Sequence, residues 1–410
     1  MKSVVKQEIQ GLNGDEAVAL AAKQCDVDVV AAYPITPQTI IVEKFSEYVA
    51  NGEVETEYVC TESEHSAMAA CLAASATGAR AFTASASAGL ALMHEMLFVT
   101  SGCRAPVVMA IANRALSAPL NIHGDHSDTM AERDSGWIQI YCENAQEVYD
   151  SVIQAFRIAE HLDVQLPVMI GLDGFTLSHT LENVKTLSDD AVKGFVGTRQ
   201  FPVVLTHEGK TVPYKLDPDS PMTMGPIALQ NYYFEFKRQQ EEAMRNALAV
   251  IPQVHDEYAE MSGRRYGDGL LEQYALEDAE VAIVSLGSTA GTVKTVVDEL
   301  RAEGVKAGLL RIRTYRPFPA ETIVKALGNA KAVAVMERSL SFGGRGGAVF
   351  HEVRHALYDA ATRPFVVNYI HGLGGRDTNP TQIRRVYEDL QKIIRSNRVD
   401  DLVRFIGLRE

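Results

Sequence analysis

The stretch Tyr33-Pro34-Ile35-Thr36-Pro37-Gln38-Thr39 follows an apolar run at residues 27–32 and precedes a segment with helical spacing of apolar residues. Two prolines three positions apart fix the backbone and keep the helix from beginning early, so the stretch is predicted to be a rigid strand-to-helix loop. Open α/β sheets bind their ligands beyond the carboxyl ends of the strands. Thr36 is therefore predicted to lie where ligands bind, although the same prolines would also suit a turn without chemistry.

Short β-branched runs alternate with helical patterns from residue 15 to about residue 180, which is typical of βα units on a largely parallel sheet. The predicted strands are residues 26–33, 79–84, 107–112 and 168–172, and the predicted helices are residues 64–77 and 89–101. A second unit of this kind begins near residue 279, with predicted strands at 281–286, 307–312 and 332–336, and helices at 289–303, 320–327, 346–360 and 381–395. The expected fold class is α/β, with two open, mostly parallel sheets and helices on both faces.

The change in composition along the chain predicts the domain organisation. Residues 1–240 are expected to form the first domain, with an irregular β excursion at about residues 185–225 that contains Leu216-Asp217-Pro218-Asp219-Ser220-Pro221. A charge-rich helical pattern runs from residue 228 to about residue 261, and residues 241–275 are expected to form a helical linker between the domains. Residues 276–410 are expected to form the second domain.

Composition and charge exclude several classes of protein. The chain has 410 residues, of which 46% are hydrophobic and 22% charged, as in ordinary globular proteins. The net charge of −14 argues against a nucleic-acid partner, because such binding needs a basic surface. The first 14 residues lack the apolar core of a signal peptide, and no apolar run approaches the length of a membrane span. We therefore expect a cytoplasmic protein without a membrane partner.

The cysteines argue against a metal or cluster site in this chain. They show no Cys-x-x-Cys pair and no Cys/His cluster with metal-ligand spacing. An iron–sulfur cluster normally needs four cysteine thiolates in recognisable runs. We expect no metal here, and expect most of the five to be buried: Cys25, Cys60, Cys71, Cys103 and Cys142.

Two charged residues are candidates for chemistry. Glu64 opens the predicted helix 64–77, where a carboxylate either complements the helix dipole or, if buried, pairs with a ring nitrogen of a cofactor. Arg114 follows the predicted strand 107–112, and its guanidinium suits either a substrate carboxylate or a loop aspartate. The loop after Arg114 is dense in polar residues, namely Asn121, His123, Asp125 and His126.

Glycine-rich stretches leave a second interpretation open. Gly343-Gly344-Arg345-Gly346-Gly347 and Gly372-Leu373-Gly374-Gly375 lie between predicted strands and helices, where such turns can cradle phosphates. Neither has a full dinucleotide fingerprint. We expect both stretches to be tight turns, and a contact with a coenzyme or with another subunit is the alternative. If they bound a nucleotide, the protein would be a nicotinamide-dependent dehydrogenase.

Taken together, the ordered motifs closely resemble the α subunit of pyruvate:ferredoxin oxidoreductase, in the 2-oxoacid:ferredoxin oxidoreductase family. The resemblance spans nearly the whole chain. It depends on Tyr33-Pro34-Ile35-Thr36-Pro37, Ser63-Glu64, Thr83-Ala84-Ser85-Ala86-Ser87-Ala88-Gly89-Leu90, Ala112-Asn113-Arg114, Gly124-Asp125-His126-Ser127-Asp128 and Arg338-Ser339-Leu340-Ser341-Phe342-Gly343, together with residues 372–377.

The resemblance implies a fold and a division of labour between subunits. The first domain would be the pyrimidine-binding domain of a thiamin diphosphate enzyme, and the second would resemble the carboxy-terminal domain of transketolases. In the family a separate β subunit holds the diphosphate and its Mg²⁺ and also bears a [4Fe-4S] cluster. This chain would then form one half of an active site.

The resemblance also assigns roles to residues. Glu64 matches the catalytic glutamate that bonds the aminopyrimidine ring of the cofactor. Thr36 and Arg114 match the residues that bind the carboxylate and adjacent carbonyl of the substrate. Pro34, Ile35 and Ser87 would contact the cofactor. The loop with Asn121, His123, Asp125 and His126 would lie near the same pocket.

The implied reaction is oxidative decarboxylation of a 2-oxoacid, most directly pyruvate, to acyl-CoA and CO2. Electrons would pass to ferredoxin through iron–sulfur clusters in partner subunits, namely the β, γ and ferredoxin-like δ subunits. Branched-chain substrates, aryl substrates such as phenylglyoxylate, and oxalate remain alternatives. The loop at residues 124–128 differs from that expected of 2-oxoglutarate relatives, so that substrate ranks lower. A non-catalytic scaffold is the alternative of another class.

Overall fold

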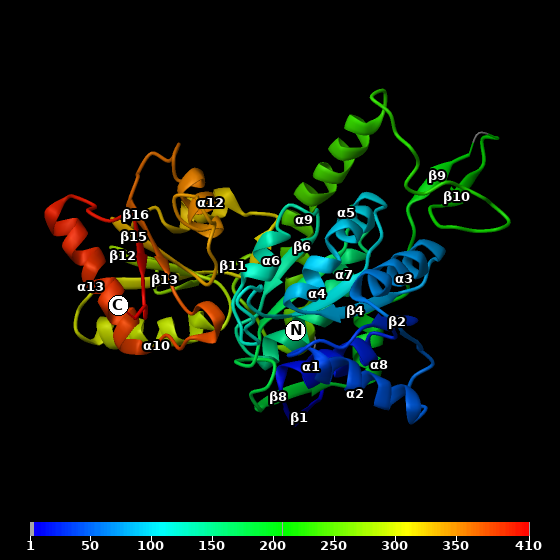
Figure 1. Ribbon diagram of the computed structural model, residues 1–410, viewed down its shortest axis with the longest axis horizontal. Coiled ribbons are helices and arrows are strands. Elements are labelled where there is room, and N and C mark those ends of the chain that lie inside the picture. The colour runs from blue at the N-terminus through cyan, green and yellow to red at the C-terminus, as the bar shows by residue number, and fades with distance from the viewer. Residues whose placement is uncertain (1–3, 207, 410) are drawn as a thin grey trace.

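The computed structural model describes residues 4–206 and 208–409. Figure 1 shows two α/β units side by side, the first in blue to green and the second in yellow to red. The strands of the first sheet are β2 (Val29–Ala32), β3 (Glu57–Cys60), β4 (Ala81–Ser85), β5 (Val108–Asn113), β6 (Ile138–Tyr141), β7 (Val168–Asp173) and β14 (Thr314–Arg316). The strands of the second are β11 (Leu271–Tyr274), β12 (Val281–Ser285), β13 (Ala307–Ile312), β15 (Ala332–Glu337), β16 (Phe365–Ile370) and β17 (Val403–Phe405).

Both sheets are open and mostly parallel, as predicted. The strand orders are β14-β6-β7-β5-β4-β2-β3 and β11-β13-β12-β15-β16-β17. Only the pairs β14–β6 and β11–β13 are antiparallel within these two described sheets. The edge strand β14 comes from the later part of the sequence but pairs with β6 of the first sheet. A separate antiparallel pair joins β1 (Gln7–Leu12) to β8 (Glu182–Leu187).

Helices cover both faces of each sheet. In the first unit these are α1 (Gly14–Gln24), α2 (Thr39–Ala50), α3 (Glu64–Thr77), α4 (Ser87–Leu92), α5 (His94–Gly102), α6 (Ser127–Ala131), α7 (Ala145–Ala159) and α8 (Asp189–Val196). In the second they are α10 (Thr289–Ala302), α11 (Ala320–Ala326), α12 (Ala348–Ala356) and α13 (Pro380–Ser396), with the 3-10 turn Leu373–Gly375. The long helix α9 (Tyr233–Ser262) lies between the two sets in sequence.

Strand alternation explains the two-sided covering. In β5, Val108 and Ala110 pack in the core with α1 and α7, whereas Met109 and Ile111 pack in the core with α3 and α5. Successive side chains of a strand point to opposite faces, so a continuous apolar run is buried on both sides. The described helices include none long and apolar enough to cross a membrane.

Local signals explain which predicted elements have the expected bounds. Helix α3 spans the predicted residues 64–77 because Ser63 accepts a hydrogen bond from the backbone of Ser66 at 3.3 Å and Gly78 ends the helix with a φ of 108°. The predicted helix 89–101 is instead two helices, α4 and α5, which meet at Met93. The sequence pattern did not show this break, since the apolar spacing continues across it.

The region at residues 185–225 is only partly the irregular β excursion that we expected. It contains the short strands β9 (Val203–Leu205) and β10 (Thr211–Pro213), but also the helix α8. Ser188 caps α8 by accepting a hydrogen bond from the backbone of Ala191, and two aspartates occupy its first turn. Helix α9, from Tyr233 to Ser262, agrees closely with the helical pattern at residues 228–261, and it begins before residue 241 and ends before residue 275, the expected bounds of the linker.

The β9–β10 hairpin and the first turns of α9 project from the body of the first unit (Figure 1). The base of this arm is tied to α3 by a hydrogen bond from the backbone of Leu216 to the carbonyl of Ala76 at 2.8 Å. Many apolar side chains of the arm are exposed: Val203, Leu205, Ile227, Leu229, Tyr232, Tyr233, Phe234 and Phe236.

A buried ionic cluster joins the two units. Glu147 of α7 accepts a hydrogen bond from Nε of Arg313 at 2.8 Å and also pairs with Arg311 of β13. Arg313 further donates to the carbonyl of Gly269 at 2.9 Å and to Oγ of Ser151 at 2.8 Å. Burial alone would raise the pKa of Glu147, but the two arginines more than offset this effect and hold it below its ordinary value.

Replacing Glu147 by Gln should leave two arginines buried without their counter-charge. We expect the free energy of unfolding at pH 7 to fall by about 3–5 kcal/mol, measured by urea denaturation. Because the folded-state pKa of Glu147 is depressed, its contribution is complete above about pH 4.3 and is lost as the pH falls through the lower value. The difference between wild type and variant should therefore shrink in acid.

A matched control is Glu257→Gln, which breaks a half-exposed pair with Arg157 at 3.0 Å. This change should cost no more than about 1 kcal/mol, since solvent screens the pair. Equal losses in the two variants would contradict the role of the buried cluster.

Candidate functional site

The predicted site residues lie at one edge of the first sheet. Strands β2, β3, β4 and β5 are parallel, so their carboxyl ends share this edge. The residues that follow those ends are Pro34, Ile35, Thr36, Glu64, Ser87 and Arg114. The structure thus brings together side chains that are far apart in the sequence.

The proline-rich loop is fixed by one buried glutamine. Gln38 accepts a hydrogen bond from the backbone of Ile35 at 3.1 Å and donates to the carbonyl of Ala84 in β4 at 2.8 Å. Thr36 and Pro34 are exposed and Ile35 is half-buried. The loop therefore holds Thr36 exposed on a fixed backbone at this edge.

Arg114 is held by two of its three guanidinium nitrogens. Nη1 donates to the carbonyl of Thr36 at 2.8 Å and Nε to the carbonyl of Asn121 at 3.0 Å, with the residue 7% exposed. Among the described residues, no group accepts a hydrogen bond from its Nη2. A nearly buried guanidinium with one free nitrogen and no carboxylate partner is suited to an anionic ligand.

Glu64 is buried at the start of α3, with 6% of its surface exposed. Its Oε1 lies 2.5 Å from the point that a β-carbon on Gly89 would occupy, and Oγ of Ser85 lies 2.6 Å from the same point. Across residues 4–206 and 208–409, neither group has a hydrogen-bond partner, and the Ser85 hydroxyl is fully buried. Two adjacent polar groups without partners are what a ring with donor nitrogens would satisfy.

Asp128, which was not predicted as a site residue, connects several of these groups. Its Oδ2 accepts hydrogen bonds from the backbones of Ser87 at 3.0 Å and Arg114 at 2.9 Å. Its Oδ1 accepts from Nδ2 of Asn113 at 2.9 Å and from the backbone of Thr129 at 2.8 Å. Burial raises the pKa of Asp128 to about 6 although the four N–H groups oppose the rise. Its only sequence signal was membership of the 124–128 run.

Ser87 has an unusual conformation within this edge. Its φ is 48°, in the left-handed region that residues with a β-carbon rarely occupy. Its hydroxyl donates to the carbonyl of Ala115 at 2.6 Å. The hydroxyl hydrogen is thus used within the chain, which leaves the oxygen as an acceptor.

The loop after Arg114 reaches the second unit. Nδ2 of Asn121 donates to the carbonyl of Gly374 at 3.0 Å, and the backbone of Gly374 donates to Oδ2 of Asp125 at 3.0 Å. His123 is exposed and its ring lies against Phe175, with 4.9 Å between centroids. Asn121 and Asp125 therefore join the edge of the first sheet to the glycine turn of the second unit.

His126 takes part in a buried ionic group at the same junction. Its Nε2 lies 2.6 Å from Oδ1 of Asp173, whose Oδ2 lies 3.0 Å from Nη1 of Arg338 and accepts from the backbone of Ser288 at 2.9 Å. Burial alone would raise the pKa of Asp173, but Arg338 and His126 hold it well below its ordinary value. His126 is therefore used in joining the units.

The glycine turns are engaged by carboxylates of the chain itself. Glu337 accepts hydrogen bonds from the backbones of Val349 at 2.9 Å and Phe350 at 3.2 Å, at the start of α12. Burial raises the pKa of Glu337 to about 7. The other turn donates through Gly374 to Asp125. Both turns therefore serve internal contacts, which argues against a dinucleotide site at either.

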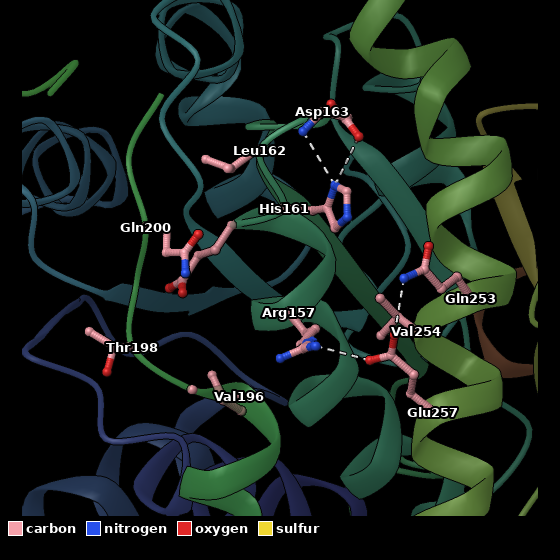
Figure 2. A pocket seen from close by; sticks show the side chains of 12 residues that line it. Arg157, His161, Leu162, Asp163, Val196, Thr198, Gln200, Gln253, Val254 and Glu257 are labelled. Carbon is pink, nitrogen blue, oxygen red and sulfur yellow. Dashed lines mark hydrogen bonds and ion pairs between the residues drawn. The ribbon is translucent and has the colours of Figure 1, made fainter. Parts of the chain in front are cut away.

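A pocket of about 440 Å³ lies elsewhere, between the end of α7, the segment after α8 and the middle of α9. Figure 2 shows that its charged side chains face one another, with Arg157 paired to Glu257 at 3.0 Å and His161 near Asp163 at 3.8 Å. None of the predicted site residues lines it. In the described parts of the chain, no group of three or more His, Cys, Asp or Glu side chains is placed to hold a metal.

Gly89→Ala tests whether the Glu64 carboxylate occupies the space that a side chain at position 89 would need. The new β-carbon would lie 2.5 Å from Glu64 Oε1, so the carboxylate must move and the variant should lose about 1–3 kcal/mol in urea denaturation. Gly194→Ala in α8 is the control, because its β-carbon would meet no atom within 4 Å. That variant should gain up to about 1 kcal/mol from helix propensity. A gain in both variants would contradict the close packing of Glu64.

Two family models match successive parts of the chain. Residues 20–256 match the family model "Pyruvate flavodoxin/ferredoxin oxidoreductase, thiamine diP-bdg". Residues 279–383 match "Pyruvate:ferredoxin oxidoreductase core domain II". Together the two models cover most of the chain.

Curated relatives are similar over nearly their full length. The chain is 50% identical to the pyruvate synthase subunit PorA of Methanocaldococcus jannaschii, covering 98% of this chain and 99% of that one. It is 51% identical to PorA of Thermotoga maritima, covering 97% and 98%. It is 42% identical to the ketoisovalerate oxidoreductase subunit VorA of Pyrococcus horikoshii, also covering 97% and 98%.

Solved structures share the fold. A 2-oxoglutarate:ferredoxin oxidoreductase from Magnetococcus marinus matches with a TM-score of 0.75 at 20% identity, covering 94% of this chain and 66% of that one. A split-gene transketolase matches with a TM-score of 0.53 at 15% identity, covering 95% and 100%. With the relatives above, the chain belongs to the pyruvate:ferredoxin oxidoreductase family, as a PorA-type subunit of a 2-oxoacid:ferredoxin oxidoreductase.

Proposed function

We propose that this chain is the α subunit of an enzyme that oxidatively decarboxylates pyruvate to acetyl-CoA and CO2 with thiamin diphosphate, and passes the electrons to ferredoxin. The observation that carries the proposal is the buried carboxylate of Glu64, which has no hydrogen-bond partner in the described part of the chain and lies on the same sheet edge as Arg114. One group is suited to a cofactor ring and the other to a substrate carboxylate. The names of the relatives support the same reaction.

Glu64 and Ser85 fit the aminopyrimidine of thiamin diphosphate, because both are polar, adjacent and without partners among the described residues. Thiamin diphosphate, when bound, supplies a carbon nucleophile for the 2-oxo carbon and accepts the electrons left after CO2 departs. Glu64 would hold a proton between its carboxylate and a ring nitrogen. Pro34, Ile35 and the Ser87 oxygen would orient the ring.

Arg114 and Thr36 would bind the 2-oxoacid. The free Nη2 of Arg114 would donate to the substrate carboxylate, and the hydroxyl of Thr36 would donate to the carboxylate or the adjacent carbonyl oxygen. Because the guanidinium is already fixed by two backbone carbonyls, little ordering is needed when the substrate binds. The loop with Asn121, His123, Asp125 and His126 would border this pocket.

The rest of the active site is proposed to come from partner subunits. A β subunit would hold the diphosphate, its Mg²⁺ and a [4Fe-4S] cluster, and γ and ferredoxin-like δ subunits would complete the assembly. Coenzyme A would take the acyl group, ferredoxin or a similar carrier would take the electrons, and the complex would work in the cytoplasm. The relatives, which are named as subunits, support a multi-subunit enzyme.

A branched-chain 2-oxoacid is the second candidate substrate. The relative named ketoisovalerate oxidoreductase subunit VorA is 42% identical over 97% of this chain, not far below the PorA relatives. A panel of pyruvate, 2-oxoisovalerate, phenylglyoxylate, oxalate and 2-oxoglutarate, assayed for CoA-dependent dye reduction by the purified complex, tests this. The highest kcat/KM should belong to pyruvate. A preference for 2-oxoisovalerate would replace the substrate and keep the chemistry.

Glu64→Gln tests the cofactor role. Glutamine fills the same space but cannot exchange a proton with the ring, so proton exchange at the thiazolium carbon should slow by about 100-fold or more in the purified complex. NMR of bound cofactor in deuterated buffer measures this rate. The control is Glu62→Gln, an exposed carboxylate two residues earlier that bonds Ser66. Normal exchange in Glu64→Gln would overturn the assignment.

Arg114→Lys tests the substrate role. Lysine keeps the charge but loses the planar fork, so KM for the preferred 2-oxoacid should rise by about 10-fold to 100-fold. Proton exchange at the thiazolium carbon should stay near the wild-type rate, because this step precedes substrate binding. Arg345→Lys, in an exposed glycine turn, serves as the control. An unchanged KM would remove Arg114 from the substrate site.

A further inference from the structure

We propose that Asp128 is a positioning residue, whose carboxylate fixes the backbones of Arg114 and Ser87 and so aims the guanidinium at the 2-oxoacid. The inference rests on the proposed function, since it assumes that Arg114 binds the substrate. Asp128 itself does not touch a ligand in this proposal. It acts through the two residues whose N–H groups it accepts.

The four hydrogen bonds at Asp128 join three parts of the chain. Ser87 follows β4, Asn113 and Arg114 lie at the end of β5, and Thr129 belongs to α6. Asp128 is 1% exposed, so these N–H groups replace water around the carboxylate. One side chain therefore sets the spacing between two adjacent strand ends and the loop that returns from them.

The conformation of Ser87 indicates that this spacing is enforced. A φ of 48° is unfavourable for serine and persists when surrounding contacts determine the backbone. Its N–H is bound by Asp128 and its hydroxyl by Ala115. Ser87 also opens α4, the helix whose Gly89 packs against the Glu64 carboxylate. The contact between Ser87 and Asp128 therefore lies between Glu64, the proposed cofactor residue, and Arg114, the proposed substrate residue.

For Arg114, Asp128 supplies the third point of attachment. The carbonyls of Thr36 and Asn121 hold the guanidinium end of the side chain. The bond from the backbone N–H to Asp128 holds the residue at its other end. Arg338 donates to the carbonyl of Gly124 in the same loop, and Asp173 at the end of β7 pairs with His126, while Asp128 attaches the loop to the ends of β4 and β5.

Only an ionised carboxylate can accept all four hydrogen bonds. In Asp128→Asn one of the two carboxylate oxygens becomes an NH2 group. This NH2 would face either the N–H groups of Ser87 and Arg114 or those of Asn113 and Thr129, so that donor would meet donor. The variant should therefore keep the volume of the side chain and lose the positioning.

The experiment measures Asp128→Asn in the full complex, with pyruvate as the varied substrate. KM should rise by about 10-fold to 100-fold, as for a lost buried hydrogen bond, while kcat at saturation changes much less. Hydrogen exchange measured by mass spectrometry should be faster for the amides of Ser87 and Arg114. Asp134→Asn, whose side chain is 71% exposed, is the control and should match wild type in both readouts.

A double-mutant cycle with Arg114→Lys separates positioning from general damage. If Asp128 acts through Arg114, its replacement should add little to KM once Arg114 is Lys. Full additivity, or an unchanged KM in Asp128→Asn, would overturn the inference. If Asp128→Asn does not assemble, Asn113→Ala removes one of the four donors, and a KM equal to wild type in that variant would overturn it as well. Failure of the proposed function looks different, because then Arg114→Lys alone would leave KM unchanged.

Discussion

Burial of charge between the two units is the constraint on which the candidate site depends. Glu147 and the two arginines from the second unit cannot be separated without exposing one sign of charge to an apolar interior. This fixes how the second sheet lies against the first. With the units fixed, Arg338 and the turn at Gly374 meet the loop after β5. The second unit therefore helps to shape the candidate site.

The site could be predicted in part because parallel strands end at one edge. Thr36 and Arg114 each follow a predicted strand of a parallel sheet, so they could be expected at one edge, whereas Glu64 was placed with them by the family resemblance. The role of Asp128 could not be predicted, since three of its four donors, from Ser87, Asn113 and Arg114, come from segments whose proximity only the folded sheet establishes. The pairing of Asp173 with Arg338 was hidden for the same reason. The individual roles of the site residues stay predictions.

The fold itself was predictable where local signals agree. Helix α3 has a cap residue at one end and a glycine at the other, and its predicted bounds are correct. Prediction was weaker where tertiary contacts decide. Strand β14 is only three residues long and depends on its partner β6 in the other unit. Helix α8 was missed because its short apolar stripe lies among threonine, valine and proline residues without a clear period.

The way Arg114 is held has an evolutionary consequence. Its guanidinium is bound by the main-chain carbonyls of Thr36 and Asn121, and these acceptors survive any substitution that keeps the backbone in place. Under the proposed role of Arg114, substitutions of the surrounding side chains can change which 2-oxoacid fits while the main chain continues to hold the guanidinium. The relatives include subunits named for pyruvate and for ketoisovalerate. Such variety is expected where main-chain atoms hold the arginine and only the surrounding side chains vary.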